Sequence, residues 1–107
     1  MNSTYKLRYL PLFYNDIEKV LLYITNNLGN QMAAIDLLKN VETSILKRLP
    51  IAEAFEPYNS KQERKYKYYR IYVKNYIIYY VVINEADQKI MEVRRFLYNK
   101  QDAFNLL

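Results

Sequence analysis

The chain contains no cysteine, no histidine and no tryptophan, and it has a single glycine. Without cysteine there is no disulfide framework, no thiolate nucleophile and no cysteine-bound metal. Without histidine a Ser-His-Asp or Cys-His mechanism is excluded, and a zinc site would have to consist of carboxylates alone. One glycine cannot form the glycine-rich loops that bind phosphate groups. We therefore expect no metal and no small-molecule cofactor.

Long apolar runs and a secretion signal are also missing. No apolar run reaches the roughly 18 residues that span a bilayer. The opening MNSTYKLRYLPLF lacks the charged start, apolar middle and small-residue cleavage site of a secretory leader. We therefore expect a cytoplasmic protein with no membrane partner. A length of 107 residues allows one hydrophobic core, so a single domain over residues 1–107 is expected.

Positive charge and tyrosine are abundant. The chain has 16 Lys and Arg against 11 Asp and Glu, a net charge of +5, and 13 Tyr. An excess of positive charge favours a polyanionic partner, either nucleic acid or an acidic protein. The same charge also keeps a protein soluble without any such partner. Charge alone leaves these alternatives open.

The first half of the chain has the periodicity of a strand followed by two helices. Residues 4–10 alternate loosely between polar and apolar, which predicts a short strand. Apolar residues then recur every three or four positions over residues 12–28, which predicts a helix closed by Gly29. Asn30 is a favourable N-cap for a second helix, which Pro50 ends. Because the joint is short, the two helices are expected to form an antiparallel hairpin.

Three strand-like runs follow a predicted loop over residues 50–64. They cover residues 66–73, 76–83 and 89–96, are rich in Val, Ile and Tyr, and are separated by short turns. The tail over 99–107 is expected to form one or two helical turns. The order β-α-α-β-β-β predicts an α+β domain with the helical hairpin on one face of an antiparallel sheet. The place of the first strand in that sheet is not fixed by the pattern.

The basic and tyrosine-rich face expected on the sheet, away from the helices, is where nucleic-acid chemistry could occur. Cations neutralise phosphate groups, and tyrosine rings stack on unpaired bases. Both residue types also occur on strands for structural reasons, since Tyr favours strands and charged side chains protect edges from aggregation. The predicted RNA-binding residues are Lys65, Lys67, Lys74, Arg94 and Lys100.

Arg70 and Arg95 are sharper candidates, because each lies within an apolar run, where an unpaired cation is costly. A planar guanidinium is well shaped to clamp a phosphate group. The structural alternative is an outward-facing arginine or a salt bridge with Glu92 or Asp102. The sequence leaves both readings open.

Cleavage of RNA would need a group that takes a proton from the ribose 2′-hydroxyl and a group that protonates the leaving oxygen. Histidine normally does both, and this chain has none. A tyrosine or lysine base would need its pKa lowered by neighbouring cations, which the basic cluster could supply. The candidates are Tyr98, a carboxylate such as Glu63 or Glu92, and Lys65 or Lys67.

The segment YYRIYVKNYIIYYVV at 68–82 and the closing EVRRFLYNKQD at 92–102, together with the order of elements, resemble a known family. They are similar to the RelE/ParE toxins of bacterial type II toxin–antitoxin systems, particularly the branch labelled plasmid stabilisation proteins. The resemblance covers nearly the whole chain. It implies a toxin neutralised by a co-expressed antitoxin protein. RelE-like members cleave mRNA on the ribosome, whereas ParE-like members poison DNA gyrase.

The resemblance also implies roles for individual residues. Arg70 and Arg95 match two arginines of the family, and Tyr98 falls where ribonuclease members carry a Tyr or His near the scissile phosphate. We therefore predict a metal-independent, ribosome-dependent mRNA endoribonuclease with these three catalytic residues and with the ribosome and mRNA as partners. The segment 98–101 reads YNKQ, where the family usually has a His, a Gly and paired Arg. A gyrase inhibitor without enzymatic activity, or an inactive antitoxin-binding relative, is the alternative.

Overall fold

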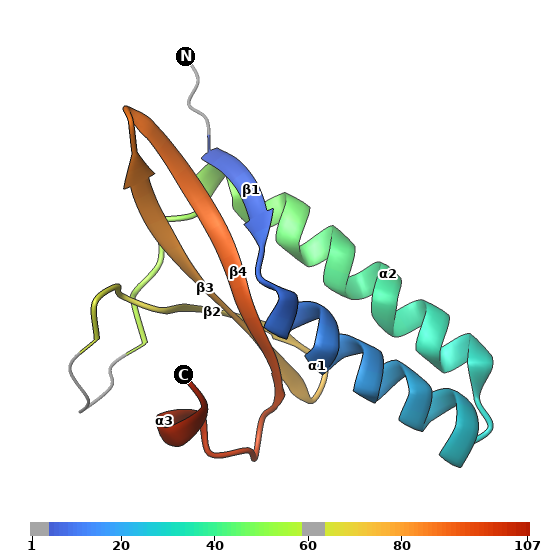
Figure 1. The fold of residues 1–107 in the computed structure, drawn as a ribbon. Helices are drawn as coiled ribbons and strands as arrows, with labels where there is room; N and C mark the ends of the chain where they lie inside the picture. Colours follow the sequence, from blue (N-terminus) through green and yellow to red (C-terminus); the bar gives the residue numbers. More distant parts are fainter. Residues whose placement is uncertain (1–4, 59–63) are drawn as a thin grey trace.

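A four-stranded sheet forms the centre of the molecule, with the strands in the order β1-β4-β3-β2 (Figure 1). The computed structural model describes residues 5–58 and 64–107. Strands β2, β3 and β4 form an antiparallel meander, whereas β1 pairs in parallel with β4. The predicted α+β fold is confirmed, and the first strand takes its place beside the last. The strands are β1 (Tyr5–Tyr9), β2 (Tyr69–Val73), β3 (Tyr76–Glu85) and β4 (Gln88–Tyr98).

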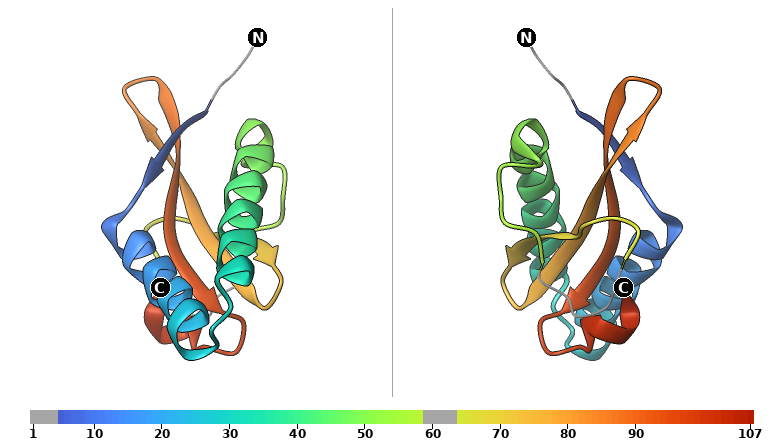
Figure 2. Two further views of the ribbon diagram at one scale, coloured as in Figure 1. Left: turned by 90° about the vertical axis from the view of Figure 1, so that its right-hand side faces the viewer. Right: turned by 90° about the vertical axis from the view of Figure 1, so that its left-hand side faces the viewer.

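Two helices cover one face of this sheet (Figure 2). Helix α1 (Pro11–Leu22) continues into a π-helical turn, Tyr23–Asn27. Helix α2 (Gln31–Arg48) begins after Asn30, whose side-chain oxygen accepts a hydrogen bond from the Ala33 N–H at 3.0 Å. Gly29 lies between the helices with φ +62°, a left-handed conformation that glycine adopts without strain. The predicted helical hairpin is therefore confirmed.

The main core lies between the helices and the sheet, and Tyr80 is at its centre. The Tyr80 side chain is fully buried. Its hydroxyl donates to the Ala52 carbonyl at 2.6 Å and accepts from Arg48 at 3.0 Å. Burial raises the pKa of Tyr80. The guanidinium of Arg48 also lies 3.6 Å from the centre of the Phe55 ring. These contacts fasten the segment after α2 to the sheet.

The other face of the sheet is covered by the loop before β2 and by the C-terminal tail, as the sequence pattern predicts for Tyr58 and Leu107. A second cluster of buried residues, including Tyr68, Tyr79 and Val81, lies there, and Tyr58 and Leu107 pack against it. The predicted strand 66–73 begins only at Tyr69, because the residues before it fold back over the sheet. The Tyr58 N–H donates to the Tyr68 carbonyl at 2.6 Å. In Figure 1 this segment and the short helix α3 (Ala103–Leu106) lie on the side of the sheet away from α1 and α2.

A β-bulge interrupts the pairing of β3 with β4. Tyr79 lies opposite Arg95 and Tyr80 lies opposite Val93, so Arg94 is the extra residue on β4. Strict alternation would send two consecutive side chains to opposite faces of the sheet. A bulge removes that constraint at one position. The consecutive residues Arg94 and Arg95 can therefore both lie on the side of the sheet away from the helices.

Glu53 joins the segment after α2 to the edge of the sheet. Its Oε1 accepts hydrogen bonds from the Tyr5 hydroxyl at 2.8 Å and from the Lys89 ammonium at 2.6 Å. The bond from Lys89 is the main reason that the pKa of Glu53 is lowered. A carboxylate whose pKa is lowered by folding stabilises the fold above its unfolded pKa. That stability is lost as the pH falls through the folded pKa.

We expect Glu53→Gln to make the melting temperature less sensitive to acid between about pH 6 and pH 3, because the variant has no proton to gain there. The effect is below about 1 kcal/mol because the side chain is partly exposed. Thermal unfolding monitored by circular dichroism over this range measures it. Glu56→Gln, an exposed neighbour, is the control. A Glu53→Gln curve as steep as that of the parent would contradict the assignment.

Candidate functional site

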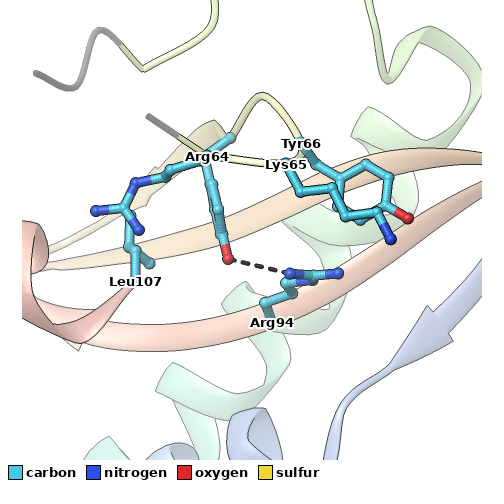
Figure 3. Close-up of a pocket in the computed structure, with 6 residues that line it drawn as sticks. Arg64, Lys65, Tyr66, Arg94 and Leu107 are labelled. Carbon is cyan, nitrogen blue, oxygen red and sulfur yellow. Dashed lines mark hydrogen bonds between the residues drawn. The ribbon is translucent and has the colours of Figure 1, made fainter. Parts of the chain in front are cut away.

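A basic pocket of about 510 Å³ opens on the side of the sheet away from α1 and α2 (Figure 3). Its lining combines three cations with two aromatic rings and one apolar side chain. The cations come from the segment before β2 and from β4, so the folding back of that segment creates the pocket. The lining residues are Arg64, Lys65, Tyr66, Tyr68, Arg94 and Leu107.

Arg94 is the most firmly positioned cation of this pocket. Its Nε donates to Glu92 at 2.8 Å and its Nη1 donates to the Tyr68 hydroxyl at 3.2 Å. Its guanidinium carbon lies 5.3 Å from the ring centre of Tyr66 and 5.8 Å from that of Tyr68. Burial on its own lowers the pKa of Arg94, but the bonds to Tyr68 and Glu92 outweigh burial, and the pKa is raised. The pocket thus has a permanent positive charge held in a fixed orientation.

Glu92 is a buried carboxylate shared by two arginines. It is 4 % exposed. Its Oε2 accepts from Arg8 at 2.8 Å, while its Oε1 accepts from Arg94 at 2.8 Å. Arg8 also lies 3.6 Å from the exposed Glu85. Because both carboxylate oxygens of Glu92 are engaged, this residue is held as a structural partner of the two cations.

Arg70 offers positive charge beside an exposed ring. Its guanidinium carbon lies 4.8 Å from the ring centre of Tyr58 and 5.7 Å from that of Tyr72. Tyr72 is 63 % exposed. Within residues 5–58 and 64–107, Arg70 forms no salt bridge with a carboxylate. This arrangement leaves Arg70 and Tyr72 able to contact an anionic or aromatic partner.

The guanidinium of Arg95 forms hydrogen bonds within the protein, to Asp16 and Leu106. Its Nε and Nη2 donate to the two carboxylate oxygens of Asp16 at 2.8 and 2.9 Å, and its Nη1 donates to the Leu106 carbonyl at 2.8 Å. The hydrogen bond with Asp16 is the main reason that the pKa of Arg95 is raised. The sequence left open a structural salt bridge with Glu92 or Asp102; Arg95 does form a salt bridge, but its partner is Asp16. Beyond Tyr9, strand β1 no longer pairs with β4, so α1 lies there and places Asp16 against Arg95.

Tyr98 lies on the opposite side of the sheet from the two candidate arginines. Its ring is 5.9 Å from that of Tyr76, which stacks on Phe96 at 4.9 Å in the core under the helices. Arg70 and Arg95 both lie next to Tyr79 in the strand register, on the other face. The structure therefore brings Arg70 and Arg95 to one face and does not bring Tyr98 to them.

Residues 7–103 match the family model of the ParE toxin of type II toxin–antitoxin systems, parDE. The chain belongs to the ParE toxin family. No curated protein matches the sequence. As the toxin of a type II system, this ParE-family member has a cognate antitoxin as a partner.

The other predicted RNA-binding residues of the toxin fall into two groups. Lys65 lines the pocket, with its ammonium 5.4 Å from the ring centre of Tyr66. Lys67, Lys74 and Lys100 are exposed and lie outside the pocket lining. The turn after β2 and the turn after β4 meet at one end of the sheet, because the Asn99 N–H donates to the Asn75 carbonyl at 2.8 Å. Glu63 lies outside the described residues.

Arg64 and Tyr68 belong to the pocket, although the sequence analysis did not predict them as RNA-binding residues. The signal that could have found them is the run 64–76, which contains five cations, five tyrosines and no acidic residue. In such a run, cations and tyrosine rings are neighbours in the sequence, so they stay close together whatever fold the segment adopts.

No three acidic side chains gather into a possible metal site in the described part of the toxin. Over the same part of the chain, none of its helices combines the length and the apolar character that crossing a bilayer requires.

Proposed function

We propose that this toxin inhibits DNA gyrase in the cytoplasm by binding it, without enzymatic activity, until its antitoxin neutralises it. The observation that supports this most is the position of Tyr98, which lies across the sheet from Arg70 and Arg95. A general acid or base must lie within hydrogen-bond reach of the proton that it transfers. Tyr98 cannot share one phosphate group with the two arginines from the opposite face.

The contacts of the other candidate catalytic groups favour the same proposal. All the guanidinium nitrogens of Arg95 donate to Asp16 or to the Leu106 carbonyl. Both oxygens of Glu92 accept hydrogen bonds from arginines. Binding of a protein target needs no proton transfer, and exposed Tyr and Arg are the residues that most often carry binding energy at interfaces. The exposed Tyr72 and the half-buried Arg70 beside it are residues of these two types.

Ribosome-dependent mRNA cleavage is the second candidate, and the basic pocket favours it. Cations with tyrosine rings between them suit single-stranded RNA. In this case Arg70 and Arg94 would hold phosphate, Lys65 would be the proton acceptor, and Lys67, Lys74 and Lys100 would follow the RNA backbone. An inactive relative that only binds antitoxin is the third candidate.

Pulse-labelling of DNA and protein synthesis after induction without antitoxin separates these functions. We expect DNA synthesis to fall first, and purified toxin to inhibit supercoiling by gyrase in vitro. Protein synthesis that falls first, with new 5′ ends mapped in mRNA, would overturn the proposal in favour of cleavage. If neither falls, the chain is an antitoxin-binding relative.

Tyr98→Phe tests the catalytic role of the hydroxyl directly. We expect growth inhibition to be unchanged, because the ring still packs on Tyr76 and no proton transfer is required. A hydroxyl acting in general acid–base catalysis contributes about 10²- to 10⁴-fold to the rate, so its removal would abolish toxicity. Tyr14→Phe, which removes an exposed hydroxyl from α1, is the matched control. Loss of toxicity in Tyr98→Phe alone would support the ribonuclease.

A further inference from the structure

Helix α2 has a second stripe on its outer side, away from the sheet. Its core stripe consists of the buried residues Ala34, Leu37, Val41 and Ile45. At 3.6 residues per turn, the outer stripe lies roughly 140° around the helix from the core stripe. Its apolar members Met32, Ile35 and Leu46 are 66, 40 and 55 % exposed. The outer stripe consists of Met32, Ile35, Lys39, Glu42 and Leu46.

The spacing of the outer stripe is that of a helix-pairing seam. Its members are separated by three, four, three and four residues, which is the a/d spacing of a coiled coil. Within the described residues, Lys39 and Glu42 take part in none of the salt bridges. The stripe therefore presents apolar side chains at both ends and a pair of exposed, opposite charges in the middle.

The stripe is complementary to itself when a second α2 runs antiparallel to the first. In the register that places Lys39 opposite Glu42 of the second copy, Ile35 lies opposite Leu46. Both contacts occur twice because the arrangement has two-fold symmetry. Opposite charges then meet at the centre and apolar side chains meet on either side. A shift of one turn in either direction would place a charge opposite an apolar side chain.

We propose that this face of α2 binds a second copy of the toxin in an antiparallel, two-fold symmetric dimer. The net charge of +5 makes two copies repel one another through most of the surface. The outer stripe carries one positive and one negative side chain, so that repulsion is smallest there. A neutral stripe offers no special attraction to nucleic acid or to a strongly acidic protein. In the left view of Figure 2, α2 lies on the helix side of the sheet, and the exposed fractions of Met32, Ile35 and Leu46 show that the stripe is accessible.

The dimer is expected to be weak. Stable complexes bury about 800 Å² on each partner, which is more than one pair of helices provides. We therefore expect a dissociation constant of roughly 10–100 μM. This inference does not depend on the target of the toxin, and its failure would leave the gyrase proposal intact.

Sedimentation equilibrium of the purified full-length toxin, from about 5 to 500 μM, tests the dimer. Lys39→Glu and Glu42→Lys each place like charges opposite one another at two points, so each is expected to weaken self-association at least tenfold. The double variant restores the opposite charges and is expected to recover the parent affinity. Lys19→Glu, with the same charge change on exposed α1, is the control and is expected to dimerise normally.

A mixture of the two single variants sharpens the test. One variant carries two Glu at the centre of the stripe and the other carries two Lys, so the mixture is expected to form heterodimers although neither variant pairs with itself. Circular dichroism verifies that every variant is folded. A parent that stays monomeric throughout, or a double variant that does not recover, would overturn the proposal. Loss of antitoxin binding in Ile35→Asp, with a parent that stays monomeric, would assign the face to the antitoxin instead.

Discussion

Asp16→Asn is expected to lower the free energy of unfolding by about 3 kcal/mol, because it leaves a largely buried guanidinium without its negative partner. The side chains of Arg95 and Asp16 are only 16 and 11 % exposed. Asp16 also accepts from the Phe96 N–H at 3.0 Å. Asparagine keeps the size of the side chain and one acceptor oxygen, so the loss reports mainly on the charge. Urea unfolding measures it.

An apolar replacement of the whole pair separates structure from function at Arg95. The double variant Asp16→Leu, Arg95→Met removes both charges together, and its stability is expected to lie closer to the parent than that of Asp16→Asn. If Arg95 only fastens α1 and α3 to β4, this variant still inhibits growth. A stable double variant that has lost toxicity would show that Arg95 contacts the target. If Asp16→Asn proves as stable as the parent, the pair is not a structural link.

Glu92→Gln is the second change with a large expected effect, again about 3 kcal/mol of stability, because two arginines lose their shared negative partner. Arg94 is held in the pocket partly by this carboxylate. Neutralising Glu92 therefore leaves an additional positive charge beside the pocket. We expect tighter binding to a polyanion, measured as a higher salt concentration for elution from immobilised heparin.

Glu85→Gln is the matched control for Glu92→Gln, because it removes a carboxylate that also faces Arg8. Glu85 is exposed and lies 3.6 Å from Arg8, so its loss is expected to cost less than about 1 kcal/mol. It also raises the net charge by one, which tests whether heparin affinity follows charge in general. Equal effects of the two variants would mean that Glu92 does not organise the pocket.

The elements of this toxin could be predicted because their signals are local. The Asn30 cap, Gly29 and the apolar period of α2 lie within a few residues of the structure that they specify. The β2–β3 and β3–β4 turns were also found, although β3 and β4 are longer than predicted. The second turn needs only Ala86 and Asp87, which both have positive φ.

The contacts that decide the site could not be predicted, because they join distant parts of the chain. Asp16 and Arg95 are 79 positions apart, and Arg8 and Glu92 are 84 positions apart. No periodicity within a strand indicates which carboxylate a helix will place beside it. The bulge at Arg94 also changes which face each arginine occupies. The candidate residues could be listed from the sequence, but their grouping depends on tertiary structure.

The parallel pairing of β1 with β4 has a consequence for the synthesis of the toxin. Strand β1 is synthesised first and β4 last, so β1 cannot pair with its partner until β4 has been made. Arg8 of β1 and Glu92 of β4 are 84 positions apart. At translation rates of about 5–20 residues per second, roughly 4–17 seconds separate their emergence. The sheet cannot be completed during that interval, and folding must finish around or after release from the ribosome. Surfaces that depend on the assembled sheet, including the basic pocket with Arg94 of β4, therefore form only after nearly the whole chain has been made.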